Sequence, residues 1–175
     1  MEKDMIILIA EDDIGHFELV KRHLWRSCVD NDFLHFKDGQ EILDYLFKRQ
    51  DEVKCEEKSR YLLLLDIRMP KIDGIEVLRR VKENEELLKI PVIMLTTTDE
   101  PCQIERCYEL GCSFYMVKPT DYNEFMKMVE DLAAILSTEW LKVPSIDRER
   151  IISADTGRIA VTCSRSPATR KLVRL

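Results

Sequence analysis

Four consecutive leucines, 62 to 65, followed directly by Asp66, constrain the fold of this chain more than any other segment. A strand inside a parallel sheet is covered on both faces, so it shows a continuous apolar run instead of an alternating one. The run after Tyr61 fits such a strand, and Pro70 and Gly74 punctuate the loop that follows. Open α/β sheets bind ligands at the carboxyl ends of their strands. Asp66 is therefore predicted to stand at such a site.

Strand-like and helix-like segments alternate along the first 140 residues. Short apolar runs predict five strands, at residues 5–10, 33–36, 62–65, 91–95 and 114–117. After each run, apolar residues recur at helical spacing, as Phe17, Val20 and Leu24 do after the first. This alternation favours a parallel sheet with helices on both faces. The predicted fold class is α/β, a doubly wound, flavodoxin-like (βα)5 sheet with strand order 2-1-3-4-5 and a ligand crevice between strands one and three.

Polar side chains follow four of these strands and converge on one edge of the predicted sheet. They are Glu11, Asp12 and Asp13 after the first strand, Asp66 after the third, Thr96 at the end of the fourth and Lys118 after the fifth. Clustered carboxylates repel one another, and Mg²⁺ relieves the repulsion because it binds carboxylate and phosphate oxygens. A lysine and a hydroxyl beside them suit phosphoryl oxygens, and a carboxylate can itself accept a phosphoryl group.

This constellation resembles the receiver domain of bacterial two-component response regulators over about residues 5 to 138. The matching motifs are Glu11-Asp12-Asp13, Asp66 with Met69-Pro70 and Asp73-Gly74, Thr96, and Lys118-Pro119. The resemblance implies a phosphorelay protein that accepts a phosphoryl group from a sensor histidine kinase. It also implies a self-catalysed phosphoacceptor instead of an enzyme that turns over a separate substrate.

The resemblance implies a role for each acid. Asp66 would be the phosphoacceptor, and the reaction would require Mg²⁺. The metal would be bound by Glu11, Asp12, Asp66 and the backbone carbonyl of Arg68. Glu11 departs from the family pattern, in which Asp is common at this position, and its longer side chain lengthens the reach to the metal.

The resemblance also implies how a signal would leave the domain. Thr96 and Lys118 would bind the phosphoryl oxygens, Tyr115 would be an aromatic rotamer switch, and the Lys118–Pro119 peptide would be cis. Phosphorylation would then change the surface formed by the fourth helix, fifth strand and fifth helix. A downstream protein target would bind there, and a homodimer is expected on the same face.

A narrower resemblance concerns small single-domain regulators paired with phytochrome-type kinases. It depends on the charged segment 48–60, the run 90–97, and Trp140-Leu141 followed by Pro144. It implies a phytochrome-type histidine kinase as the partner.

Two other functions fit parts of the pattern. An aspartyl-phosphate-type phosphohydrolase shares a sheet-end aspartate and Mg²⁺, but it would have a second acid two residues after the nucleophile, where this chain has Arg68. A pseudo-receiver would be a phosphorylation-independent interaction module. The complete set of acids, with Thr96 and Lys118, argues against that role.

A shift in charge marks the end of the predicted domain. The chain carries a net charge of −6, and residues 141–175 hold eight basic and three acidic residues, or +5, which leaves −11 for residues 1–140. We therefore expect a receiver domain at 1–140 and a basic extension at 141–175 that is too short for a separate output domain. Apolar residues on either side of Asp155-Thr156-Gly157 would allow a short hairpin, which would need to dock on the domain or on a dimer mate. A disordered or loosely docked extension is favoured over contact with nucleic acid.

Other parts of the sequence restrict location and metal chemistry. No apolar run has the length of a membrane span or of a signal-peptide core, so a cytoplasmic protein is expected. The six cysteines lack the two-residue gap of zinc or redox motifs, which favours small buried thiols. His16 and His23 share one predicted helix without an acid placed beside them. His35 is expected to be packed or to lie at a sheet edge.

Overall fold

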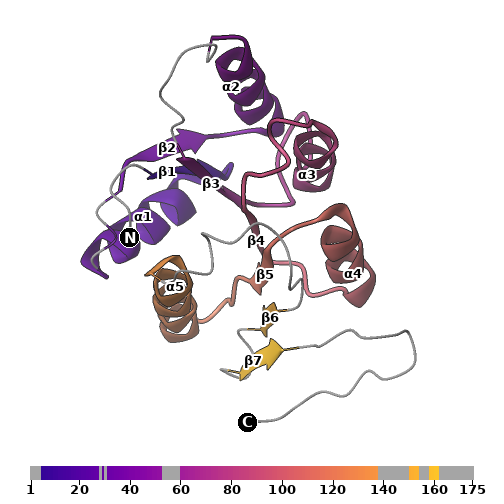
Figure 1. Cartoon of the computed structure of the whole chain (residues 1–175). Coiled ribbons are helices and arrows are strands. Elements are labelled where there is room, and N and C mark those ends of the chain that lie inside the picture. Colours follow the sequence, from indigo (N-terminus) through magenta and orange to yellow (C-terminus); the bar gives the residue numbers. More distant parts are fainter. Residues whose placement is uncertain are drawn as a thin grey trace.

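The computed structural model describes residues 5–27, 29, 31–52, 60–137, 150–153 and 158–161. Strands and helices alternate through this range (Figure 1). They are β1 (Met5–Ala10), α1 (Ile14–Arg26), β2 (Phe33–Phe36), α2 (Gly39–Glu52), β3 (Arg60–Leu65), α3 (Gly74–Glu83), β4 (Val92–Thr96), α4 (Pro101–Leu110), β5 (Phe114–Val117), α5 (Tyr122–Ser137), β6 (Arg150–Ser153) and β7 (Arg158–Val161). Within the described ranges, no helix has the length and apolar character needed to cross a membrane.

The sheet confirms the predicted topology and extends it. Its first five strands are parallel and lie in the order β2-β1-β3-β4-β5. The five predicted strands are extended by the two strands of the tail hairpin, because β6 adds to β5 in parallel and β7 pairs with β6 in antiparallel orientation (Figure 1). The predicted hairpin therefore docks on its own domain. Its turn at 155–157 and the boundary expected near Pro144 lie outside the described residues.

The four leucines of β3 divide between the two faces of the sheet. Leu62 and Leu64 pack with α1 and α5, whereas Leu63 and Leu65 pack with α2, α3 and α4. Figure 1 shows these two groups of helices on opposite sides of the strands. Each leucine is at most 1% exposed, and burying one contributes about 1.5–3 kcal/mol. This burial holds the carboxyl end of β3, and Asp66 with it, at the middle of the sheet edge.

Aspartates start the helices that follow this edge. Asp13 caps α1 by accepting hydrogen bonds from the amides of Gly15 and His16, at 2.7 and 3.0 Å. Asp73 caps α3 through the amide of Glu76 at 2.8 Å. Such caps satisfy amides that have no partner inside the helix. They therefore fix the short loops between the strand ends and the helices.

Gly74 allows α3 to begin against the main chain of Asp66. A Cβ at this position would lie 2.0 Å from the Asp66 carbonyl oxygen, and the Gly74 amide donates to the Ile67 carbonyl at 2.9 Å. Only a residue without a side chain permits this approach. The glycine therefore sets how close the first turn of α3 lies to the acid.

We predict that Gly74→Ala destabilises the fold by about 1–3 kcal/mol, because the added methyl group collides with main-chain atoms that cannot move independently. Urea unfolding measures the change. Gly15→Ala is the control, since its Cβ would meet a side-chain oxygen of Asp13 at 3.0 Å and no main-chain atom. Equal unfolding midpoints for the two variants would contradict the prediction.

Candidate functional site

Three carboxylates meet at the carboxyl ends of β1 and β3. Glu11 and Asp12 follow β1, Asp66 follows β3, and each offers an oxygen that lies within 4.8 Å of the others. The two strands are neighbours with Ala10 opposite Leu65, and the Asp66 amide donates to the Ala10 carbonyl at 3.0 Å. The strand register therefore brings the predicted acids together. Glu11 and Asp66 are buried, whereas Asp12 is exposed.

Lys118 supplies the cation of this site. Its Nζ donates to Glu11 Oε2 and to Asp66 Oδ2, the second at 2.8 Å. The lysine is 4% exposed, so an ammonium without these partners would carry a large desolvation cost. Lys118 follows β5, and β4 separates β5 from β3. The long side chain therefore joins strand ends that are not adjacent.

Negative charge exceeds positive charge in this cluster. Burial raises the pKa of Glu11 above its ordinary value of 4.5, and the neighbouring Lys118 opposes that rise. The second Glu11 oxygen, Oε1, lies 3.3 Å from Nδ1 of His16. Lys118 pairs with two of the three acids, so a further cation would lower the repulsion among them.

The donor set suits Mg²⁺. All three acids offer carboxylate oxygens, which are the hard ligands that this ion prefers, and exposed Asp12 leaves a side open to water ligands. The Arg68 amide donates to Asp66 Oδ1 at 3.3 Å, which places Arg68 in the same loop beside the acid. The role expected for the Arg68 carbonyl stays a prediction.

Thr96 and Tyr115 are connected through Thr98. The Thr98 amide donates to Thr96 Oγ1 at 3.4 Å, and the Tyr115 hydroxyl donates to the Thr98 carbonyl at 2.7 Å. Burial raises the pKa of Tyr115, so its hydroxyl stays protonated and remains a donor. Both Thr96 and Tyr115 are fully buried. A rotation of Thr96 would therefore disturb the loop that Tyr115 holds.

The expectation of a cis Lys118–Pro119 peptide is wrong for this structure. Among the described residues, no peptide bond is cis. The trans form of a peptide before proline is favoured by about 0.5–1 kcal/mol. Lys118 reaches both acids from the trans backbone, so its ion pairs do not require the other isomer.

Two histidines contact Glu11, although their sequence context did not mark them as functional. His16 faces the Glu11 side chain, and His35 Nε2 lies 2.8 Å from the Glu11 carbonyl oxygen. Pairing the two predicted strands in the correct register would have indicated His35. Phe36 pairs with Ala10, so the residue before it lies beside the end of β1.

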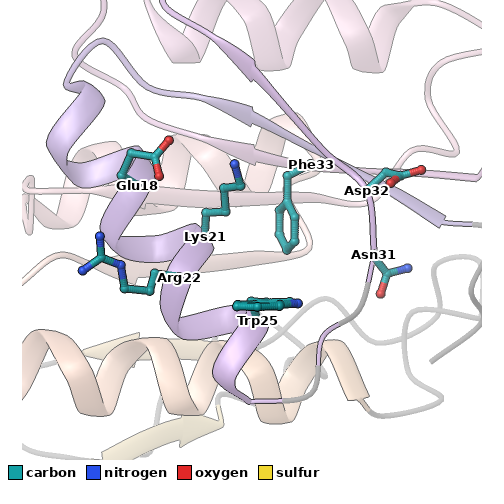
Figure 2. A pocket seen from close by; sticks show the side chains of 7 residues that line it. All are labelled: Glu18, Lys21, Arg22, Trp25, Asn31, Asp32 and Phe33. Carbon is teal, nitrogen blue, oxygen red and sulfur yellow. The ribbon is translucent and has the colours of Figure 1, made fainter.

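A cavity of about 570 Å³ lies between α1 and the start of β2. Figure 2 shows the Trp25 and Phe33 rings near each other, with charged side chains of α1 around them. The lining residues are Glu18, Lys21, Arg22, Trp25, Asn31, Asp32 and Phe33. It lies at the amino end of β2 and is therefore remote from the acids at the carboxyl ends. The acid cluster with Lys118 is the candidate functional site.

Comparisons with known proteins agree with this fold. The profile of the response regulator receiver domain matches residues 7–130. The response regulator Rcp1 of Synechocystis sp. is 31% identical to this chain over 81% of this chain and 92% of Rcp1. A crystal structure of Rcp1 in its Mn²⁺-bound form superposes with a TM-score of 0.66, and the match covers 81% of this chain and 97% of the crystallised chain.

Two further solved structures are similar. A response regulator receiver domain from Rhodospirillum rubrum is 37% identical, with a TM-score of 0.70, over 75% of this chain and 93% of that one. The bacteriophytochrome response regulator RtBRR is 36% identical, with a TM-score of 0.61, over 80% of this chain and 83% of that one.

We predict that Lys118→Met destabilises the fold by about 3 kcal/mol at neutral pH, because two buried carboxylates lose their cation. Added Mg²⁺ should recover more stability in this variant than in the parent, since the ion would neutralise the same acids. Urea unfolding with and without Mg²⁺ measures both effects.

Lys37→Met is the matched control. Its ion pair with Glu41 is exposed, with 67% and 39% of the two side chains accessible, and exposed pairs contribute little. The prediction fails if the two lysine variants unfold at the same urea concentration.

Proposed function

Because this chain belongs to the receiver domain family of two-component response regulators, we propose that Asp66 accepts a phosphoryl group from the phosphohistidine of a sensor histidine kinase. The position of Asp66 carries this proposal. The acid lies 6% exposed at the end of β3, 2.8 Å from the Lys118 ammonium, and beside the oxygens of Glu11 and Asp12. This arrangement joins a nucleophile, a cation and a set of metal ligands.

The transfer forms one bond and breaks one. An oxygen of the Asp66 carboxylate attacks phosphorus, the P–N bond to the donor imidazole breaks, and the departing nitrogen keeps the electron pair. Bound Mg²⁺ would supply the positive charge that lets two anions approach each other. Lys118 would pair with a phosphoryl oxygen, and the Thr96 hydroxyl would donate to another.

Glu11, Asp12 and Asp66 are the proposed metal ligands, together with the Arg68 carbonyl. Their oxygen donors support Mg²⁺. The crystal structure of the relative Rcp1 in a Mn²⁺-bound form supports a divalent ion of this type. The domain would catalyse only its own phosphorylation and dephosphorylation.

We propose that phosphorylation is transmitted through Thr96, Thr98 and Tyr115 to the surface of α4, β5 and α5. A phosphoryl group that draws the Thr96 hydroxyl toward it would rotate this side chain and so weaken the hydrogen bond that Oγ1 accepts from the Thr98 amide. The loop after β4, which Tyr115 holds through the Thr98 carbonyl, would then move to a second conformation. Phosphorylation would thus shift the balance between two states of the domain. Because β6 covers the edge of β5, a target or a second copy would bind α4 and α5 instead of that edge.

A phytochrome-type kinase is the proposed donor. RtBRR, which is 36% identical to this chain, is described as a bacteriophytochrome response regulator. Phosphotransfer from purified kinases of this type, compared with other histidine kinases, tests this assignment.

We predict that acetyl phosphate with Mg²⁺ adds one phosphoryl group to the parent chain, and that Asp66→Asn abolishes the addition. Intact-protein mass spectrometry measures the product, and hydroxylamine should remove it as an acyl phosphate. Chelation of the metal should abolish labelling, because the anionic donor would then meet unneutralised acids.

Asp73→Asn is the matched control for this experiment. Its side chain caps α3, and asparagine caps as well as aspartate does, so labelling should match the parent. Equal labelling of Asp66→Asn and the parent would overturn the assignment. Multiple turnover of small phosphate esters would instead favour a phosphohydrolase.

We predict that Tyr115→Phe leaves labelling of Asp66 intact but speeds amide exchange in the loop after β4. The variant loses the 2.7 Å hydrogen bond to the Thr98 carbonyl and keeps the buried ring. Hydrogen exchange measured by mass spectrometry on unphosphorylated protein checks this. Unchanged exchange at residues 97–99 would argue against the proposed connection.

A further inference from the structure

His35 binds the peptide that joins the two acids after β1. We propose that His35 is a positioning residue for the metal site, which holds the Glu11–Asp12 peptide so that both carboxylates present their oxygens to one cation. This inference depends on the proposed function, because it assigns a role toward the Mg²⁺ of that site.

The hydrogen bond has a single direction. His35 Nε2 lies 2.8 Å from the Glu11 carbonyl oxygen, and a carbonyl only accepts, so the Nε2 nitrogen carries the hydrogen. That carbonyl belongs to the Glu11–Asp12 peptide. On its other side, the Glu11 amide donates to the Phe36 carbonyl at 2.9 Å. β2 therefore holds both peptide groups of Glu11, one through its main chain and one through His35.

Packing fixes the direction of the imidazole. Its ring stacks on Phe17 with 4.1 Å between centroids and 13° between planes. Phe17 is itself 6% exposed in α1, and Lys21 Nζ lies 5.4 Å from the centroid of its ring. The stack sets the plane of the ring, and the hydrogen bond to the Glu11 carbonyl selects the one of its two flips that points Nε2 at the loop. The nitrogen is thus held in place at the loop.

The loop needs such support because it is short and carries a long acid. Three residues, 11 to 13, separate the end of β1 from the start of α1. Glu11 has one more rotatable bond than an aspartate, so its oxygens reach a fixed point only if its backbone is held. Mg²⁺ demands near-octahedral geometry from its ligands. Hydrogen bonds that orient ligands from outside commonly change metal affinity about 10- to 100-fold.

The test compares two variants of His35. His35→Phe keeps a ring that can stack but has no hydrogen-bond donor, and His35→Gln restores a donor without the ring. We expect His35→Phe to bind Mn²⁺ about tenfold more weakly than the parent, measured by electron paramagnetic resonance of the free ion. In the metal-free chain, the amides of Asp12 and Asp13 should exchange faster with deuterium. His35→Gln places an amide donor near the position of Nε2 and should recover most of the affinity.

Phe17→Leu separates positioning from general stability. This variant loses the stack but keeps the His35 donor, so it should unfold at lower urea and yet lose less Mn²⁺ affinity than His35→Phe does. If His35→Phe does not fold, the Mn²⁺ affinities of His35→Met and His35→Gln are compared instead. These two side chains have similar shape, and only glutamine carries a hydrogen-bond donor.

The outcomes are distinct. Parent-like Mn²⁺ affinity in His35→Phe, or equal affinity in the Met and Gln variants, would overturn the role of His35 while leaving Asp66 phosphorylation in place. Absence of Mn²⁺ binding and of Mg²⁺-dependent labelling in the parent chain would overturn the proposed function together with this inference.

Discussion

The ion pairs of Lys118 with Glu11 and Asp66 are the interaction on which this site depends. All three residues are at most 6% exposed, so each charge would be unfavourable in the folded chain without the others. The lysine comes from β5 and the acids come from β1 and β3. The pairing therefore links three strand ends across the sheet edge, and it places a cation beside Asp66 and a second carboxylate. A cation beside Asp66 suits the proposed phosphoacceptor role, because it would pair with the oxygens of an incoming phosphoryl group.

The sheet supplies this arrangement through close main-chain contacts. The Asp66 amide is bonded to the Ala10 carbonyl, and Gly74 brings the first turn of α3 onto the Asp66 carbonyl. On the opposite side of the site, β2 binds both peptide groups of Glu11. The acids are thus held by backbone hydrogen bonds from neighbouring elements.

The β6–β7 hairpin changes how the proposed output surface of α4, β5 and α5 is built. In a five-stranded domain β5 would be the edge strand, with unpaired main-chain groups available to a partner. Here β6 pairs with β5, so those groups are already bonded within the chain. Contacts with a target or a second copy would then depend on side chains of α4 and α5. The strand β6 belongs to the basic extension, and it pairs with the strand that carries Tyr115.

By itself, the sequence determined the order of the first five strands and the set of polar residues at their carboxyl ends. Leu62 to Leu65 marked a strand covered on both faces, and parallel strand ends must meet at one edge, so the acids, Thr96 and Lys118 could be grouped from the order of the strands alone. Only the tertiary structure decided that Lys118 bonds Glu11 as well as Asp66, that the peptide before Pro119 is trans, and that His35 holds the Glu11–Asp12 peptide. Side-chain direction and backbone isomer depend on the packing of several distant segments. The periodicity of apolar residues indicates which face of a helix or strand a side chain lies on. It does not indicate which atoms that side chain contacts.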